Sequence, residues 1–389
     1  MKTILIFTQE YLHNKQPAAG GTGSFYTKYV SSLLEKGYKV VVFGNSSMAL
    51  EEKQGNLHIC LLKKNYFKKH FVQELFRSIG KRLKIAALEA FFLKKEVRHL
   101  TNELKRFLKK EDIHPDVIET HDWNGISLFL DELHIPYVVR AHGCYTILNK
   151  YFGYNTSLGV SLIEREALKK ASHLICVSKS SQLMYEETFS KKGTIITNGV
   201  ACYGEQDFSQ TIPFSVFFFG TVTLKKGFDT ALSVFNKLLK KNPKTTLHII
   251  GKGYKDYLRK NNLGEIKNVV DYGFLEGDEL KKTLQKANVF IFPSRGETFG
   301  LALCEAMAIG KAVVAADIPS FRDIITHKEN GFIAKNDDEY YEYITKLFED
   351  ETLNKTIAEK ALQTIQNQYN FEKTIESSLL YYQKITDTK

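Results

Sequence analysis

The 389-residue sequence predicts an α/β protein made of two doubly wound parallel sheets. First, short apolar runs alternate with helical patterns and glycine turns, which is typical of parallel strands joined by helices. Second, this alternation stops in a stretch rich in glycine and polar residues, 198–213, and then restarts. Third, the length suits two domains of ordinary size.

The first half begins with a buried strand at residues 3–7. A glycine-rich turn at 20–23 follows, and then a helical pattern over 24–35 that ends at Gly37, a residue that favours helix ends. Further short apolar strands are expected at residues 39–43, 116–119, 137–140 and 173–177.

The second half repeats this arrangement from a strongly apolar strand at residues 215–219. A helix over 228–240 is stopped by Asn242-Pro243, since proline cannot continue a helix. The remaining strands are expected at residues 246–250, 269–272, 289–292 and 312–316. We therefore expect domains over 1–205 and 206–370 and a closing helix over 371–389.

Composition excludes several classes of protein. The five cysteines are scattered, with no Cys-x-x-Cys pair and no Cys/His cluster, so neither a disulfide framework nor a zinc site is predicted. The apolar start is too short for a signal peptide, and no run approaches the ~20 apolar residues that span a bilayer. We expect a cytoplasmic protein, with the inner face of the plasma membrane as its site of any membrane contact.

The net charge of +10 is concentrated in the segment 63–110, where fifteen Lys/Arg stand against four Glu. Apolar residues recur there at helical spacing between the lysines: Phe67, Phe71, Leu75, Ile79 and Leu83, and further on Phe91, Phe92 and Leu93. A basic amphipathic helix of this kind can lie on an anionic membrane. Ordinary surface helices explain the pattern equally well. No nucleic-acid-binding motif accompanies the segment, so we expect no nucleic-acid partner.

The most informative motif follows the strand at 289–292. A glycine turn leads into an alanine-rich helical pattern that ends at Gly310. A strand, a turn and a helix N-terminus together form an anion site, because unpaired N–H groups and the helix dipole point at the ligand. Two carboxylates, Glu297 and Glu305, bracket the turn with seven residues between them. Since carboxylates repel phosphate, they suit the hydroxyl groups of a sugar or a ribose.

The Glu-seven residues-Glu spacing, with Phe299-Gly300 inside it and Ala306-Met307-Ala308 after it, resembles the signature of retaining glycosyltransferases of family four. The resemblance implies the GT-B fold, in which two Rossmann-like domains face a central cleft. It implies hexosyl transfer from a nucleotide-diphosphate sugar, expected to be a UDP sugar, with no metal or other cofactor. The implied acceptor is a glycan or a lipid-linked glycan of a surface polysaccharide or glycolipid. An ordinary strand–turn–helix unit with surface glutamates is the alternative.

The resemblance assigns donor-binding roles in the second domain. Glu297 would bind hydroxyls of the donor sugar and Glu305 the ribose. The backbone of Phe299, Gly300 and Leu301 would cap the phosphates.

A second donor motif runs from Gly220 to Gly227. Within it Lys226 matches the family's diphosphate-binding lysine, but Thr221 stands where the family usually has arginine. Lys225 or Arg295 could supply the missing charge.

In the first domain the resemblance places Gly20 and Gly21 under the donor sugar and diphosphate. It places His142, which follows the strand at 137–140, beside the reacting carbon of the sugar, so that His142, Glu297 and Lys226 form the expected catalytic set. A structural histidine is the alternative for His142.

His121 and Asp122 resemble the family's acceptor-side segment. Asp122 could instead cap a helix that starts at Asn124. We interpret Glu164 and Arg165 as structural or acceptor-facing. The closing helix, 371–389, is similar to the family helix that crosses back to the N-terminal domain, although a terminal helix of the second domain would show the same pattern.

Two other functions fit parts of the sequence. Thr221 is compatible with a GT-B-fold subunit that has lost activity and binds a glycan or a partner. A GT-B sugar phosphorylase is the other alternative. The sequence shows no Ser/His/Asp triad and no carboxylate pair typical of a glycosidase. In this family, retention is generally taken to proceed by departure and attack on the same face of the sugar.

Overall fold

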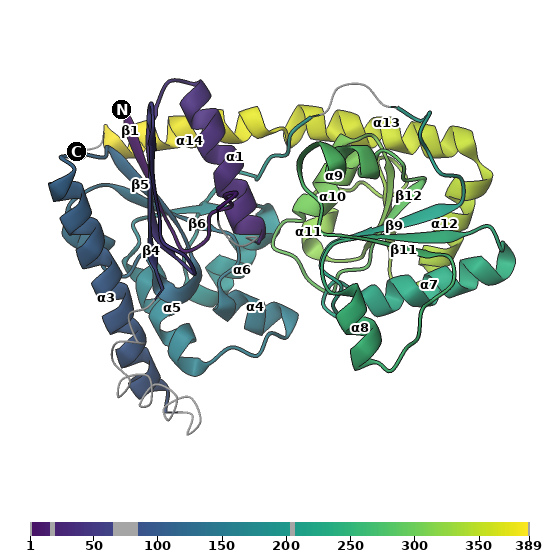
Figure 1. Cartoon of the computed structure of the whole chain (residues 1–389), viewed down its shortest axis with the longest axis horizontal. Helices are drawn as coiled ribbons and strands as arrows, with labels where there is room; N and C mark the ends of the chain where they lie inside the picture. Colours follow the sequence, from purple (N-terminus) through teal and green to yellow (C-terminus); the bar gives the residue numbers. More distant parts are fainter. Residues whose placement is uncertain (1, 16–19, 65–84, 203–206, 388–389) are drawn as a thin grey trace. The chain divides into compact units, whose positions relative to one another are not determined.

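The computed structural model describes residues 2–15, 20–64, 85–202 and 207–387 of the chain. These residues form two compact units (Figure 1). The first unit contains Met1–Thr197 together with Ile375–Lys389, and the second contains Asn198–Thr374.

The first unit is built on a sheet whose described strands run in the order β3-β4-β2-β1-β5-β6-β7-β8. All neighbours are parallel except β3, which pairs antiparallel with β4 at the edge. The strands are β1 Thr3–Thr8, β2 Lys39–Ser46, β3 Leu50–Gln54, β4 Leu57–Lys63, β5 Val117–His121, β6 Tyr137–Ala141, β7 His173–Cys176 and β8 Thr194–Ile195.

Both faces of this sheet are buried, as expected of parallel strands. Leu5 and Phe7 of β1 face a core that includes Leu104 and Phe107 of helix α3, whereas Ile6, on the opposite face, is equally buried. The helices in the described part of this unit are α1 Gly21–Glu35, α3 Ala86–Lys110, α4 Tyr145–Phe152, α5 Leu158–Lys170, α6 Lys179–Phe189 and most of α14 Phe371–Thr386, with 3-10 helices η2 Trp123–Gly125 and η3 Leu130–Leu133.

The second unit has an all-parallel sheet whose described strands run in the order β11-β10-β9-β12-β13-β14. The strands are β9 Ser215–Phe219, β10 Thr246–Ile250, β11 Val269–Gly273, β12 Val289–Phe292, β13 Ala312–Ala316 and β14 Phe332–Ala334. The helices are α7 Phe228–Lys241, α8 Tyr254–Lys260, α9 Gly277–Leu284, α10 Leu301–Ala308, α11 Pro319–Arg322, α12 Asp337–Glu349 and α13 Glu351–Gln368.

The predicted fold class is confirmed, since the chain folds as two Rossmann-like units with parallel sheets. Four strands were not expected from the sequence: β3, β4, β8 and β14. Of the predicted basic amphipathic segment, residues 65–84 lie outside the described residues, and α3 contains the remainder from Ala86. No helix in the described part of the chain is long and apolar enough to span a membrane.

Each sheet has a switch point, where two neighbouring strands connect onward to strands on opposite sides of the sheet. The switch point of each sheet positions the candidate site residues of that unit. In the first unit, β1 is followed by β2 on one side, and its neighbour β5 is followed by β6 on the other side. In the second unit, β9 is followed by β10 on one side, and its neighbour β12 is followed by β13 on the other side. Open α/β sheets bind ligands outside the carboxyl ends of such strands. The chain that follows these four strands contains Glu10, Asp122, Gly220 and Glu297.

Candidate active site

Two glycines keep the turns of the second unit in close contact. Gly227 precedes α7 with a φ of 71°, and a Cβ there would lie 1.9 Å from the carbonyl oxygen of Pro293. Gly251 after β10 has a φ of 144°, and its Cβ would lie 2.0 Å from the carbonyl oxygen of Gly220. Only glycine fits such positions. The loops after β9, β10 and β12 therefore pack together at the carboxyl edge of the sheet.

This packing brings Lys226 and Glu297 together. The Lys226 Nζ lies 2.5 Å from Glu297 Oε1, and the hydroxyl of Ser294 donates to the same oxygen at 3.0 Å. The Lys226 side chain is 36% exposed and the Glu297 side chain 18%, so a ligand can reach the pair. The sequence leads us to expect both residues at the donor, but it does not predict their ion pair.

Arg295, in the turn after β12, contacts the loop after β9 and the start of α7. Its Nη2 lies 2.5 Å from Asp229 Oδ2, and its Nη1 donates to the carbonyl oxygen of Leu224. Its charge is therefore balanced by Asp229 in the first turn of α7. Thr221 is exposed, and Lys225 is half-buried, with burial lowering the pKa of its ammonium.

The helix α10 starts where the motif predicted a helix N-terminus. Gly300 precedes it with a φ of 116°, and a Cβ there would lie 2.8 Å from the ring of Phe321. Phe299 is buried against the ring of Tyr369, whereas Leu301, the first helical residue, is half-buried. The first turn of α10 thus presents its N–H groups beside the Glu297 turn.

Glu305 lies on the second turn of α10 and is half-buried. Glu297 thus lies in the loop before α10 and Glu305 lies within the helix, as the motif predicted.

In the first unit, Gly20 and Gly21 open α1 after β1. The Gly20 N–H donates to Glu10 Oε1, and a Cβ at Gly20 would lie 2.6 Å from that oxygen. A carboxylate therefore occupies the start of α1, a contact that the sequence analysis missed. The sequence feature that could have indicated this contact is the position of Glu10, shortly after the first strand.

His121 lies at the end of β5 and is buried. Its Nε2 accepts from the backbone N–H of Gln9 at 3.1 Å, and its ring stacks on Trp123 with centroids 3.8 Å apart. Burial, assisted by the charge of nearby groups, lowers its pKa well below the ordinary value. A neutral His121 thus joins the ends of β5 and β1.

Asp122 is also buried, and its carboxylate binds the loop that carries His142. Oδ1 accepts from the backbone N–H of His142 at 3.0 Å, and Oδ2 accepts from that of Gly143 at 3.1 Å and from the hydroxyl of Tyr185. Burial raises the pKa of Asp122 to about 7.

The helix-capping alternative for Asp122 is wrong. The chain forms a 3-10 helix at Trp123–Gly125 rather than a helix from Asn124, and the Asp122 side chain makes no capping hydrogen bond to it. The reason is that both carboxylate oxygens are directed at the neighbouring loop instead.

His142 follows β6 and is half-buried. Its ring contacts Phe25 and Tyr26 of α1 edge-on, with centroids 5.0 and 5.5 Å away. Burial and the positive charge of Arg140 lower its pKa well below the ordinary value. The imidazole is therefore neutral at physiological pH and can act as a hydrogen-bonding group.

Glu164 has a structural role. Its fully buried carboxylate accepts from the backbone N–H groups of Asn124, Tyr145 and Thr146 at 2.8–3.1 Å, and from the Thr146 hydroxyl at 2.6 Å. Arg165 points elsewhere, with its Nη1 donating to the carbonyl oxygen of Thr188 at 2.9 Å. Glu164 and Asp122 thus bind the chain on either side of Cys144.

No group of three or more His, Cys, Asp or Glu in the described ranges lies close enough together to hold a metal ion.

Two Rossmann-like units with loops of this kind at their switch points define the GT-B fold of nucleotide-sugar-dependent glycosyltransferases. The family model described as "Glycosyltransferase Family 4" matches residues 19–202, and that described as "Glycosyl transferases group 1" matches residues 205–364. The chain belongs to this family of glycosyltransferases and is an enzyme that uses a nucleotide-sugar donor.

Individual relatives agree with this assignment. An uncharacterized glycosyltransferase of Methanocaldococcus jannaschii is 26% identical over 67% of this chain and 72% of its own length. Phosphatidyl-myo-inositol mannosyltransferase of Mycolicibacterium smegmatis is 27% identical over 61% of this chain and 62% of its own.

Solved structures show the same fold. Sucrose-phosphate synthase from Thermosynechococcus elongatus has a TM-score of 0.75 at 16% identity and full coverage of both chains. Anabaena HepE, solved in complex with UDP and glucose, has a TM-score of 0.66 at 17% identity, covering 97% of this chain and 98% of its own.

Proposed function

We propose that this enzyme is a retaining glycosyltransferase that moves a sugar from a UDP sugar to a glycan or lipid-linked acceptor of a surface polysaccharide or glycolipid. The observation that carries this proposal is the contact of Lys226 with Glu297 at the carboxyl ends of β9 and β12. A cation next to a carboxylate suits a donor in which a diphosphate is joined to a sugar, because the cation can bind the diphosphate and the carboxylate can accept from the sugar hydroxyls. UDP is the nucleotide bound to the relative HepE.

The donor would bind along these loops. Lys226 would meet the negative charge that develops on the leaving diphosphate, which is where electrostatic stabilisation acts most strongly. The first turn of α10, from Phe299 through Gly300 to Leu301, would donate N–H groups to phosphate oxygens. Glu297 would accept from sugar hydroxyls and Glu305 from the ribose.

The roles proposed for residues of the first unit are those that the family resemblance implies. The backbone of Gly20 and Gly21 would lie under the donor sugar and diphosphate. The neutral imidazole of His142 would hydrogen-bond the sugar near its reacting carbon. His121 and Asp122 would line the acceptor side, although the backbone contacts of Asp122 already occupy both of its oxygens.

In the proposed reaction, the bond between the anomeric carbon and the diphosphate oxygen breaks, and the nucleotide diphosphate leaves with the electron pair. The acceptor oxygen forms the new bond on the same face of the sugar. Its proton passes to a phosphate oxygen of the leaving group, so no protein nucleophile is required.

The proposal is tested by incubating the enzyme with a panel of nucleotide sugars and measuring nucleotide release, with the Glu305→Ala variant in parallel. Release from one donor, lost in the variant, would support the proposal and name the donor. A folded protein that neither binds nor hydrolyses any donor would instead support a subunit that has lost activity. The anomeric configuration of the product, read by NMR, tests retention separately.

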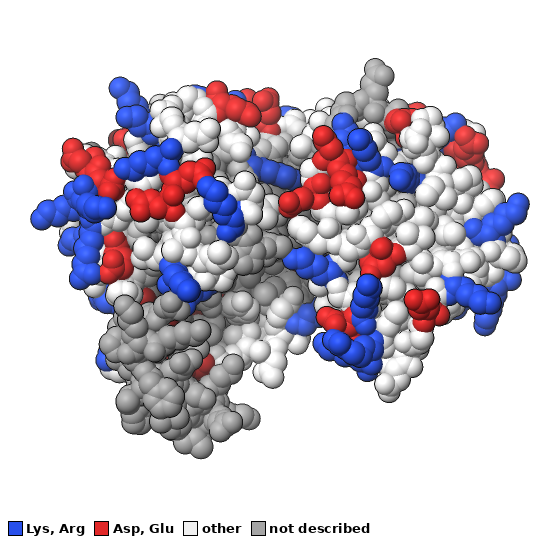
Figure 2. Space-filling model, viewed as in Figure 1, with Lys and Arg blue, Asp and Glu red and all other residues white. Residues whose placement is uncertain are grey.

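The basic segment also supports a proposal of peripheral membrane contact. On α3, Phe91 is 51% exposed, and the ammonium of Lys95 lies 4.5 Å from the centroid of its ring. On the face seen in Figure 2, lysine and arginine side chains are interspersed with carboxylates over the described residues. Binding to an anionic bilayer would therefore start from this exposed aromatic and its lysine rather than from a broad basic field on that face.

Sedimentation with vesicles tests this contact. Phosphatidylcholine vesicles that contain phosphatidylglycerol should retain the wild-type enzyme more than vesicles without it, and Phe91→Ser should reduce this retention. Leu380→Ser, at a residue that is 69% exposed on α14, is the matched control and should have no effect. Equal retention of all three proteins would contradict the proposal.

A further inference from the structure

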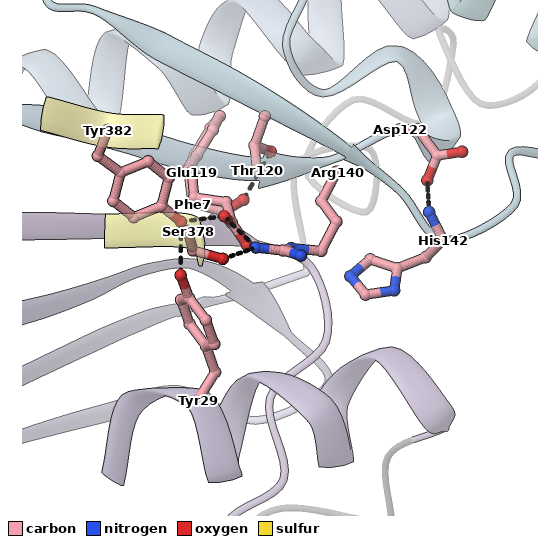
Figure 3. Close-up of polar contacts among 9 residues, drawn as sticks. All are labelled: Phe7, Tyr29, Glu119, Thr120, Asp122, Arg140, His142, Ser378 and Tyr382. Atoms are coloured by element: carbon pink, nitrogen blue, oxygen red, sulfur yellow. Dashed lines mark hydrogen bonds and ion pairs between the residues drawn. The ribbon is translucent and has the colours of Figure 1, made fainter. Parts of the chain in front are cut away.

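A buried charged network links the C-terminal helix to the strand that precedes His142 (Figure 3). Arg140 of β6 and Glu119 of β5 are both fully buried. Their contact is bidentate: Nε lies 2.8 Å from Oε1, and Nη2 lies 2.9 Å from Oε2. Such a fork fixes the guanidinium in position and angle, which a single contact does not.

Helix α14 completes this pair from outside the sheet. The hydroxyl of Ser378 accepts from Arg140 Nη2 at 2.8 Å. The hydroxyl of Tyr382 donates to Glu119 Oε2 and lies 2.8 Å from the hydroxyl of Tyr29 on α1. Ser378 is 238 positions from Arg140 in the sequence, and Tyr382 is 263 positions from Glu119.

Stability alone is a weak explanation for this arrangement. Removing two charges from water costs free energy that their attraction barely recovers, and apolar replacements of buried ion pairs are often equally stable. Buried polar networks do, however, rigidify the groups that they pair. Both Glu119 oxygens and the Nε and Nη2 of Arg140 are paired here, whereas Arg140 Nη1 has no hydrogen-bond partner among the described residues. A network of this kind can hold a neighbouring site residue in one position.

The nearest candidate is His142. Its backbone N–H donates to the carbonyl oxygen of Arg140 at 3.0 Å, so the turn that carries it starts from this residue. The Arg140 guanidinium also lies 5.1 Å from the ring centroid of Phe25, which in turn contacts the His142 imidazole at 5.0 Å. Two short paths therefore run from Arg140 to His142, one through the backbone and one through Phe25.

We propose that Arg140 is a positioning residue for His142, and that Ser378 and Tyr382 hold it in place, so that the C-terminal helix contributes to sugar transfer through His142. This inference rests on the proposed function, which places His142 beside the donor sugar. A displacement of about 1 Å in a reacting group can cost about 10²-fold in rate. Loosening Arg140 should therefore lower turnover more than it lowers donor binding.

The first test compares two neighbouring serines of α14. Ser378→Ala removes the hydroxyl that accepts from Arg140, whereas Ser377→Ala changes an exposed residue. We expect Ser378→Ala and Tyr382→Phe to lower kcat for donor turnover by about 10-fold or more, with the donor KM within about 3-fold of wild type. Ser377→Ala should match wild type. Unchanged kcat in both Ser378→Ala and Tyr382→Phe would overturn the proposal.

A double-mutant cycle separates positioning from general destabilisation. Residues that act through one another are not additive, whereas independent sites are. If Ser378 acts through His142, then Ser378→Ala should cost little further kcat in a His142→Ala background. Losses that multiply fully would contradict the proposal.

An NMR measurement tests the inference even if no donor is turned over. The ring nitrogen and proton signals of His142 should shift in Ser378→Ala and Tyr382→Phe but not in Ser377→Ala. Unchanged signals in an active enzyme would refute the positioning role and leave the proposed function standing. Inactive wild type with shifted signals would refute the proposed function and leave the structural link standing.

Discussion

The ammonium of Lys226 and the carboxylate of Glu297 lie 2.5 Å apart, although 71 residues separate them in the chain. The two loops reach each other because β9 and β12 are parallel neighbours and because Gly227 lets one loop pack on the carbonyl of Pro293. The pair holds one charge of each sign at the edge where a charged donor and its sugar would bind.

Glu297→Gln should separate sugar recognition from nucleotide recognition. The amide keeps the size of the side chain but cannot accept from sugar hydroxyls with a full charge. We expect kcat/KM for the UDP sugar to fall about 10²-fold, in the range of one lost electrostatic contact. The affinity for UDP itself should stay within about 3-fold of wild type, as measured by calorimetric titration. A loss of UDP affinity as large as the loss of turnover would contradict the assignment of Glu297 to the sugar.

The contact of Gly227 with Pro293 can be tested through stability. Gly227 and Gly273 both have left-handed φ values, 71° and 67°, but only at Gly227 would a Cβ meet another atom. Gly273→Ala should cost about 1–2 kcal/mol for the backbone conformation alone. Gly227→Ala should cost about 1–3 kcal/mol more, because the loop must also move. Urea unfolding of the two variants measures the difference in the free energy of unfolding. Equal losses in the two variants would show that the contact of Gly227 with Pro293 does not contribute to stability.

The Asp122 contacts predict different effects for two buried tyrosines. Tyr185 donates to Asp122 and accepts from the backbone N–H of Cys144 at 3.1 Å, so Tyr185→Phe leaves both groups without this hydroxyl. A loss of about 1–3 kcal/mol in the free energy of unfolding is expected. The buried hydroxyl of Tyr137 has no hydrogen-bond partner among the described residues, so Tyr137→Phe should be neutral or stabilising. The reverse order of the two variants would contradict the geometry at Asp122.

Stability should depend on pH through His142. Its folded pKa is lowered, by burial first and by Arg140 second, whereas in the unfolded chain it is about 6.5. Below that pH the unfolded chain gains a proton that the folded protein does not, so stability is lost as pH falls. Wild type should therefore lose stability relative to His142→Gln as pH falls below about 6.5, with a limiting slope of about 1.4 kcal/mol per pH unit. Urea unfolding at each pH measures it, and a difference independent of pH would show that the imidazole titrates normally.

The sequence predicted the two sheets and the positions of most strands because apolar strands and glycine turns are local signals. It missed β3, Leu50–Gln54, because four of its five residues are charged or polar and it pairs only at the sheet edge. The motif at Glu297 and Glu305 was also local, so its loop and helix could be placed.

The network around Arg140 could not be predicted in this way. A strand pattern identifies Arg140 and Glu119 as charged residues within buried segments, but their partners come from α14, more than two hundred residues away. Similarly, the ion pair of Arg295 with Asp229 depends on how α7 packs beneath the turn. Contacts of this kind follow from tertiary packing and leave no local pattern.

The central claim, that the loops at Lys226 and Glu297 bind the diphosphate of a nucleotide sugar, is tested most directly by calorimetric titration of UDP into wild type, Lys226→Met and Lys237→Met. Lys237 pairs with Asp338 on the surface of the same unit and is the matched control. We predict that Lys226→Met weakens UDP binding by 10-fold or more, a loss of about 1.4 kcal/mol or more, and that Lys237→Met binds like wild type. Equal UDP affinity in all three proteins would contradict the claim.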